Sequence, residues 1–496
     1  MHRCLEITEI LLEIFELVFN DDCYPNLASL ARTCRSFNGP ALDVLWQDQS
    51  SLLPLVRCFP REILDLSGTT AVRVKFVNFL DTGSATSLGF QCQKFAKVPS
   101  VQDWERPSVY AKRIRILEST ILDATVLQTL LQSCPSPPLL PNLRHLGIDS
   151  HHVDTTSGYD AYVASLFTSF SPKLLQSLQI ECGLESNDTL YLLTQLPKHC
   201  AQIEFLYVSL LDSPSRDIAE YIASFASMRH LKSLDFTLVN SDSAAVSFHR
   251  PSSINTPNGF PSVIELSVNF RSTVTALDIF KAIHSTQLRR IDVCLPFEGD
   301  IANLREVLAT ITSRPAWKQS MRSISLTTGG CSMTANDVQG LLTFNHLRCL
   351  HLNRTGLVLD DYLLNDMAKA WPMLERLFIA NPLSRSSPKA TLNGLVPFSK
   401  HCPHISILHL SLDATDVPAL ANTTDAPRDD SRRGDRRLVL LVDMPSEICD
   451  PIGVASFLLN LFPRITVTVA VVDNHDEFQP AFLWRRVANI IEGTRK

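Results

Sequence analysis

Few short clusters in the sequence combine residue types that could do chemistry together. The tightest is His-Cys-Pro-His at 401–404, whose imidazoles and thiol are groups that zinc prefers. A zinc site needs three or four ligands in tetrahedral reach, and no second half with suitable spacing is present. We therefore expect His401, Cys402 and His404 to be ordinary residues of a helix end and a loop. The pair His151 and His152 follows a strand-like segment and is expected to be exposed.

Nucleophilic and phosphate-transfer chemistry lacks its usual sequence patterns. The chain has no Gly-x-Ser-x-Gly elbow, no Walker loop, no Gly-x-Gly-x-x-Gly and no His-Glu-x-x-His. Cys34 could act as a nucleophilic thiol, but it falls on the apolar side of an expected helix, where a packed thiol is typical. The sequence therefore predicts a protein that is not an enzyme, with no catalytic residue, no metal and no cofactor.

The composition allows a large core and argues against nucleic acid and membrane as partners. The chain has 496 residues, 45% of them hydrophobic, and a net charge of −6 without a polybasic block. Nucleic acid and membrane are therefore not expected partners. Four glutamates in the first 20 residues argue against a secretory signal, and no run of 18 apolar residues occurs. The 13 cysteines are scattered singly, as reduced thiols are. We expect a cytoplasmic and/or nuclear protein.

One short pattern, apolar-x-x-apolar-x-apolar, returns eleven times through the body of the chain. The matches start at 111, 143, 175, 203, 231, 263, 288, 321, 347, 374 and 405, so they are 25 to 33 residues apart. Helix-like segments lie between them, and several open with Asp, Asn or Ser, which accept the unpaired N–H bonds of a helix start. Strand and helix in regular alternation predict a parallel sheet.

Two architectures satisfy this alternation, a closed (β/α)₈ barrel and an open solenoid. A barrel uses eight units, whereas eleven matches and further strand-like segments at 438–442 and 465–472 are present. The pattern and its spacing resemble the longer leucine-rich repeats. We therefore predict an α/β fold, a leucine-rich-repeat-like open solenoid with parallel strands on the concave side and helices on the convex side.

The remaining segments divide the chain further. Residues 49–110 are expected to link to the solenoid and cap its first end, and the solenoid itself is expected over 111–472. The polar, mixed-charge stretch at 422–437 predicts a disordered loop. The amphipathic pattern within 473–496 predicts a helix that caps the other end.

Three short helices are expected before residue 48. Apolar residues at helical spacing predict the first at about 7–19, with glutamates elsewhere on its cylinder. The second is expected at about 27–34. The third is expected at about 40–47, with Pro40 in its first turn, where proline suits a helix start. So short a segment rarely buries that much apolar surface alone, so it packs on the rest of the chain or binds a partner.

The segment from Glu6 to Trp46 resembles an F-box, the helical module that docks on the adaptor of SCF-type ubiquitin ligases. With the repeats behind it, the chain resembles fungal (basidiomycete-type) F-box proteins with leucine-rich-like repeats, although Ile7-Thr8 stand where that family usually has Leu-Pro. The resemblance implies a substrate-recognition subunit of an SCF-type E3 ligase. The adaptor-binding residues that it implies are Ile7, Ile10, Leu11, Ile14, Phe15, Leu30, Cys34, Phe37, Leu45 and Trp46.

A protein substrate is expected on the outward face of the repeat strands. In each match the residue between the last two apolar positions points away from the core. The residues of this row that suit a protein interface are Tyr207, Asp235, Asp292, His351, Phe378 and His409.

Two other functions fit parts of the sequence. The first is a repeat-type interaction scaffold without a ligase role, favoured if the apolar face of 7–46 is buried against the first repeat. The second is a barrel enzyme, favoured if the strands close on themselves.

Overall fold

The computed structural model describes most of the chain, with several gaps. The described residues are 5, 7–20, 24–65, 71–74, 88–91, 94–118, 124–149, 170, 173–183, 187–211, 218–239, 259–270, 273–295, 301–380, 387–419, 437–443, 446–470 and 479–494. His151, His152 and all but the last residue of the expected polar loop at 422–437 lie outside the described residues.

Fourteen strands form one sheet in which each strand lies beside its predecessor in the chain, and the first and last strands are not paired with each other. Every neighbouring pair with a described register is parallel. The expected open α/β solenoid is therefore confirmed, and a closed barrel is not the fold. The strands are β1 (Asp48–Gln49), β6 (Ile116–Leu117), β7 (His145–Asp149), β8 (Ser177–Gly183), β9 (Phe205–Leu211), β10 (Ser233–Val239), β11 (Glu265–Asn269), β12 (Arg290–Leu295), β13 (Ser323–Thr328), β14 (Cys349–Asn353), β15 (Arg376–Ala380), β16 (Ile407–Leu410), β17 (Arg437–Asp443) and β18 (Arg464–Ala470).

The chain divides into two compact units near residue 231. The first unit holds the strands up to β9, two short antiparallel pairs and the first group of helices. Its pairs are β2 (Leu64–Asp65) with β5 (Lys94–Phe95) and β3 (Ala71–Val74) with β4 (Leu88–Gln91). Its helices are α1 (Thr8–Asn20), α2 (Tyr24–Leu30), α3 (Arg35–Gln47), α4 (Leu53–Val56), α5 (Glu105–Ala111), α6 (Ala124–Ser133), α8 (Asn187–His199) and α9 (Ile218–Ala226).

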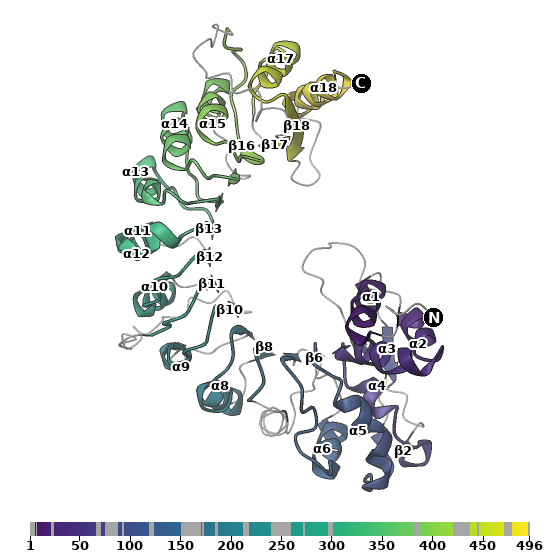
Figure 1. Ribbon diagram of the computed structural model, residues 1–496. Coiled ribbons are helices and arrows are strands. Elements are labelled where there is room, and N and C mark those ends of the chain that lie inside the picture. The colour runs from purple at the N-terminus through teal and green to yellow at the C-terminus, as the bar shows by residue number, and fades with distance from the viewer. Residues whose placement is uncertain are drawn as a thin grey trace. The chain divides into compact units, whose positions relative to one another are not determined.

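In the second unit the helices from α10 to α15 lie on one side of the strands (Figure 1). At the end of the chain α18 packs against the last strand, β18, and against α17. There Trp484 is fully buried and its indole N–H donates to the Ser446 carbonyl at 3.0 Å. The helices of this unit are α10 (Thr273–Ala282), α11 (Ile301–Ser313), α12 (Pro315–Ser320), α13 (Ala335–Gln339), α14 (Asp361–Ala370), α15 (Val396–His401), α17 (Pro451–Leu461) and α18 (Gln479–Gly493).

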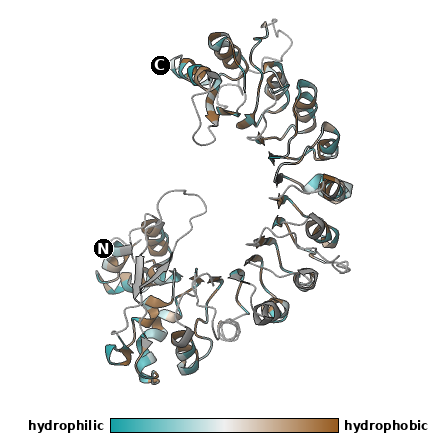
Figure 2. Ribbon diagram, turned by 180° about the vertical axis from the view of Figure 1, so that it is seen from behind, coloured by the Kyte–Doolittle hydropathy of each residue, from teal (hydrophilic) through white to brown (hydrophobic). Residues whose placement is uncertain are grey.

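The apolar positions of the repeat fill the space between strands and helices. In the match that contains β14, Leu347, Leu350 and Leu352 are each fully buried, whereas His351 between them is only half-buried on the opposite face. Successive strand residues point to opposite faces, so one face is apolar and the other is open to partners. Figure 2 shows that the helices carry both hydrophobic and hydrophilic residues, as elements with one buried side do.

Several expected boundaries differ from the structure. α3 begins at Arg35, so Pro40 lies inside the helix and not in its first turn. Ala41 and Val44 on the same helix are fully buried, and this packing outweighs the hydrogen bond that proline cannot donate. The second helix ends at Leu30 and is followed by a turn.

The sheet also begins earlier than the expected range of 111–472. β1 at Asp48–Gln49 pairs with β6, directly after α3. The first repeat is shifted as well. Leu117 lies opposite Leu146, so the pattern starts at Ile114 and not at 111. The reason is that Ala111 still belongs to helix α5.

Candidate functional site

The first three helices form a small module with a core of its own; the name three-helix module is used below for residues 7–47. Phe15 and Phe37 meet edge to face with ring centroids 5.5 Å apart, which ties α1 to α3. The module therefore does not need the repeats to bury its interior. Its buried residues are Leu11, Phe15, Leu27, Ala31, Ala41 and Val44.

A second apolar row, which starts at Ile7 directly before α1 and continues along this helix, stays outside the core. Ile7, Ile14 and Leu17 are 46%, 38% and 67% exposed, and Ile10 is half-buried. Their spacing of three, four and three residues places them along one line of the helix. This row, called the α1 stripe below, is distinct from the side that carries the glutamates. Among the described elements, α1 packs mainly on α2 and α3, and neither covers the stripe.

The structure separates the predicted adaptor-binding residues into three kinds, which are buried, exposed and half-buried. Leu11 and Phe15 are 1% and 2% exposed, so they support the module from inside and do not form its surface. Ile7 and Ile14 are exposed. The others are half-buried, namely Ile10, Leu30, Cys34, Phe37, Leu45 and Trp46.

Sequence reasoning missed one member of the stripe and misplaced a thiol. Leu17 continues the spacing of Ile7, Ile10 and Ile14, and that continuation was visible in the sequence. Cys34 was expected to pack on the apolar side of a helix, but it precedes α3 in an extended conformation and is half-buried. Its Sγ lies 3.1 Å from the Ser36 hydroxyl, and this hydrogen bond lowers the pKa of the Cys34 thiol.

The module is attached to the repeats through α3. Asp43 on α3 forms an ion pair with Arg113, which also donates to the Gly39 carbonyl at 3.2 Å. Trp46 stacks on Tyr110 of α5 with ring centroids 4.4 Å apart and planes 20° from parallel. These contacts use α3 and leave the stripe on α1 out of the attachment.

In the second unit, five of the six predicted substrate-binding residues fall in one row across the sheet. The register pairs Asp235 with Ser267, Ser267 with Asp292, Asp292 with Ser325, and Ser325 with His351. It then pairs His351 with Phe378 and Phe378 with His409. Tyr207 lies on β9 in the first unit, so it is described apart from this row.

The side chains at the two ends of the row differ in chemical type. Burial raises the pKa of Asp235, and the nearby Asp292 raises it further, while the hydrogen bond from Ser267 lowers it. At the other end Phe378 lies between two imidazoles, with ring centroids 5.3 Å from His351 and 6.1 Å from His409. The row therefore presents two carboxyl groups at one end and an aromatic cluster at the other.

Burial shifts the two histidines toward their neutral form. Burial lowers the pKa of His351, with a smaller lowering from His409 and an opposing effect of Asp292. Burial also lowers the pKa of His409, against Asp443. The Nε2 atom of His409 is buried and has no hydrogen-bond partner in the part of the chain that the structure describes. Leaving a buried nitrogen unpaired costs free energy, so this atom is a local cost to the fold.

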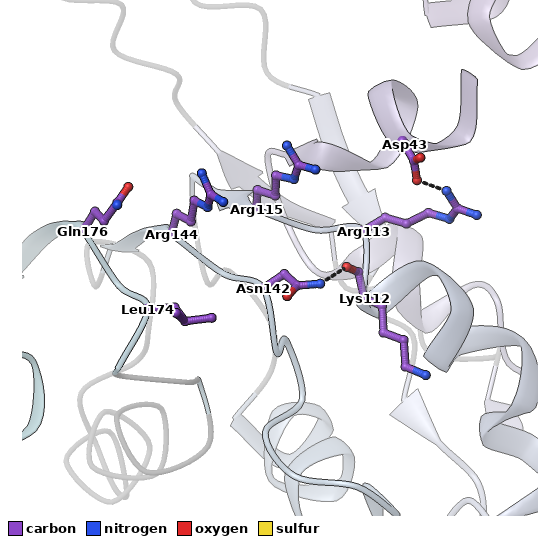
Figure 3. A pocket seen from close by; sticks show the side chains of 8 residues that line it. All are labelled: Asp43, Lys112, Arg113, Arg115, Asn142, Arg144, Leu174 and Gln176. Carbon is purple, nitrogen blue, oxygen red and sulfur yellow. Dashed lines mark hydrogen bonds and ion pairs between the residues drawn. The ribbon is translucent and has the colours of Figure 1, made fainter. Parts of the chain in front are cut away.

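A basic pocket of about 470 Å³ lies in the first unit (Figure 3). Sequence reasoning missed it, although a signal exists. The second position of the repeat, in the structural frame, is basic in six of eleven cases: Arg115, Arg144, Lys232, Arg289, Arg322 and Arg348. The pocket is lined by Asp43, Lys112, Arg113, Arg115, Asn142, Arg144, Leu174 and Gln176.

In the second unit, arginines at the second position of the repeat also lie close to one another. Burial lowers the pKa of Arg322, and the neighbouring charges of Arg348 and Arg289 lower it further. Arg348 is paired with Glu375 at 3.1 Å, and Arg322 donates to the carbonyls of Gln319 and Met321. These partners satisfy the two side chains within the fold.

The cluster at 401–404 is dispersed in the structure. Cys402 is fully buried, and burial raises the pKa of its thiol to about 12, while His401 and His404 are exposed. Within the described ranges, no three His, Cys, Asp or Glu residues gather in a way that could hold a metal ion. None of the described helices is both long and apolar enough to cross a membrane.

No known protein family and no curated protein matches this sequence. Among solved structures, the chain is similar to one from yeast, that of the complex of Rad7 and Elc1. The identity is 15%, the match covers 59% of this chain and 77% of that chain, and the TM-score is 0.31.

Proposed function

We propose that this chain is the substrate-recognition subunit of an SCF-type ubiquitin ligase, with the three-helix module acting as its F-box. In this proposal the α1 stripe binds the ligase adaptor, and the row from Asp235 to His409 binds a target protein. The observation that carries the proposal is the stripe itself: an apolar row left exposed on a module that already has a complete core.

The stripe offers enough apolar surface to hold a partner. Fully burying one isoleucine or leucine side chain is worth roughly 1.5–3 kcal/mol. Several such side chains in one line can act as the central anchors of a protein interface. An exposed apolar row of this kind commonly marks an interaction site.

The contacts of the module favour docking over a capping role. A cap would bury its apolar face against the first repeat. Instead the module is attached by α3, through Asp43 and Trp46, and the described elements that pack on α1 belong to the module. This arrangement supports the ligase proposal against a scaffold in which the helices serve only as a cover.

The mechanism would be one of proximity. A receptor that holds a target beside a ubiquitin-charged enzyme turns a bimolecular encounter into an effectively unimolecular step. In this proposal the chain makes and breaks no bond, uses no cofactor and works in the cytoplasm or the nucleus. The carboxyl groups of Asp235 and Asp292 supply polar contacts to the target.

Co-purification of the full chain with the SCF adaptor tests the docking surface. The informative variant is Ile14→Asp with Leu17→Asp, because both side chains are exposed and neither supports the core. Val109→Asp on α5 is the matched control, since Val109 is 51% exposed and lies away from the stripe. Substitution of Leu11 or Phe15 would unfold the module, and truncation near residue 50 would remove β1.

The expected result is that the unaltered chain and Val109→Asp retain the adaptor and the double variant loses it while staying folded. Retention by the double variant would remove the stripe as the docking surface. A folded, unaltered chain that does not bind the adaptor would overturn the ligase proposal and leave a repeat scaffold.

A further inference from the structure

The basic pocket of the first unit contains more positive charge than its own carboxylate neutralises. Four cationic residues line it, and Asp43 is the single acid in the lining. That carboxylate is already paired with Arg113. The exposed side chains of Arg115 and Arg144 form no described hydrogen bond or ion pair with residues that the structure describes. The pocket therefore carries a net positive charge, and no carboxylate of its lining is left to pair with Arg115 and Arg144.

The backbone places Arg115 and Arg144 on neighbouring rungs of the sheet. The amides of Arg144 and His145 both donate to the Arg115 carbonyl, at 2.7 and 3.0 Å. The amides of Gln176 and Ser177 donate in the same way to the Arg144 carbonyl. Adjacent strands lie about 4.8 Å apart, so the fold holds two like charges side by side. Figure 3 shows both guanidinium groups projecting to the same side, whereas the Lys112 ammonium extends away from them.

A buried donor in the same lining lacks an acceptor. Arg113 Nε is buried and has no hydrogen-bond partner among the described residues. An unsatisfied buried donor costs roughly 1–3 kcal/mol, and because this Nε atom is shielded from solvent, a ligand in the open pocket does not reach it. Recognition of an anion in this pocket therefore rests on the exposed guanidinium groups of Arg115 and Arg144.

We propose that this pocket binds a small phosphate monoester. Its phosphoryl group lies between Arg115 and Arg144, and its organic part lies along Asn142, Leu174 and Gln176. This inference goes beyond the proposed function and does not depend on it, because no residue of the pocket lining belongs to the α1 stripe or to the row in the second unit.

The chemistry of the lining selects this class of ligand. Two guanidinium groups match the roughly −1.5 to −2 charge of a phosphate monoester and its three acceptor oxygens. A carboxylate carries only a single negative charge. The pocket also provides one apolar wall, since Leu174 is 51% exposed, and the amide side chain of Gln176, which suits a hydroxyl group. The amide nitrogen of Asn142 already donates to the Lys112 carbonyl at 2.7 Å, so only its oxygen is left for a ligand. A volume of about 470 Å³ lies within the range of small-molecule sites.

Titration calorimetry on the full chain, without the adaptor, tests the proposal. The probes are inorganic phosphate, glycerol phosphate, ribose phosphate and adenosine monophosphate, with acetate as the carboxylate control and a phosphothreonine peptide as the macromolecular alternative. We expect at least one ester to bind more tightly than inorganic phosphate. Arg115→Gln and Arg144→Gln should each weaken it about tenfold or more, because each removes a charge-assisted hydrogen bond.

The matched control is Arg61→Gln, an exposed arginine of the first unit outside the pocket lining, which should change the affinity less than about twofold. Arg144→Lys should bind with intermediate affinity, because it keeps the charge and loses the planar fork. No binding of any ester up to about 10 mM would overturn the proposal. So would an affinity that Arg144→Gln leaves unchanged, or binding of the phosphopeptide alone. Adaptor binding is measured separately, so failure here leaves the proposed function standing.

Discussion

Leu11 and Ile14 lie three residues apart on the same apolar arc of α1, yet Leu11 is 1% exposed and Ile14 is 38% exposed. Successive residues of a helix are rotated by 100° about its axis. Viewed down the axis of α1, the apolar positions form one arc of about 220°, with Leu17 at one edge and Leu12 at the other. A helix that buries one side needs an arc of little more than about 100°. The excess half of the arc is the α1 stripe, which is why the module has both a core and a free apolar surface.

This division predicts opposite outcomes for two similar truncations. Leu11→Ala should destabilise the three-helix module by about 2–5 kcal/mol, because it leaves a cavity in a small core. Ile14→Ala should change stability by less than about 0.5 kcal/mol, because its side chain packs against little. Hydrogen-exchange protection of α1 and α3 in the full chain measures both. Equal losses in the two variants would mean that the stripe is packed.

Two glycines should respond to alanine with opposite signs. Gly147 is buried on β7, where an added Cβ would collide with the backbone carbonyl of Glu118. Gly147→Ala should therefore cost about 1–3 kcal/mol. Gly39 lies inside α3 with nothing within 4 Å of an added Cβ. Gly39→Ala should stabilise by roughly 0.5–1 kcal/mol, since alanine suits a helix interior better. The midpoint of urea unfolding reports both, and the idea fails if the two midpoints shift in the same direction.

Asp337 should make the second unit sensitive to acid. Its carboxylate accepts from Arg305 Nε at 2.6 Å and from the Thr334 amide at 2.8 Å at the start of α13. The hydrogen bond from Arg305 is the main cause that lowers the pKa of Asp337. The folded pKa lies below the unfolded value of about 3.9, so this stability is present above about pH 3.9 and is lost as the pH falls through the folded pKa.

Asp337→Asn should therefore flatten the fall of unfolding free energy between about pH 5 and pH 3. The measurement is urea unfolding of the second unit in the full chain across that range. Asp366→Asn on α14, an exposed carboxylate, is the control and should keep the slope of the unaltered chain. A slope that Asp337→Asn leaves unchanged would show that the carboxylate contributes no pH-dependent stability.

His351 and His409 should make the row sensitive to pH near neutrality. Burial holds the pKa of both below the unfolded value of about 6.5. Because the pKa of these histidines is lower in the folded chain than in the unfolded chain, the unfolded chain takes up protons at a higher pH when the solution is acidified. The stability is then complete above about pH 6.5 and declines as the pH falls from there through the folded pKa.

The variant His409→Gln should reduce the difference in urea midpoint between about pH 7.5 and pH 5.5, because glutamine does not take up a proton. The exposed His346, replaced by glutamine, is the matched control and should leave that difference as it is. If both variants behave alike, burial of His409 is not the source of the pH dependence.

The repeat body shows how far the sequence alone reaches. The period of apolar residues predicts which face of each strand is buried, so Asp292, His351 and Phe378 were placed on the open face correctly. The first repeat was misplaced by three residues because Ala111, Ile114 and Leu117 all satisfy the same apolar spacing. Only the pairing of Leu117 with Leu146 distinguishes the frames.

The pocket and the stripe lay beyond such local patterns. Arg115 and Arg144 are 29 residues apart in the chain and become neighbours only when their strands pair. Arg113 and Asp43 are 70 residues apart and meet because α3 packs on the first repeat. The spacing of residues along the sequence does not predict contacts of this kind unless the register of the repeats and the packing of the helices are already known.

The sequence by itself determined the alternation of strand and helix, the parallel direction of the strands, the apolar positions of the core and the presence of three helices before it. These follow from hydrophobic period and turn residues, which act over a few neighbouring positions. Only the tertiary structure decided which part of the wide apolar arc of α1 is core and which is surface, and which charged residues share a pocket. Those outcomes depend on contacts between segments that are far apart in the chain. The local sequence pattern is compatible with several arrangements, and side-chain packing and strand pairing determine which one forms.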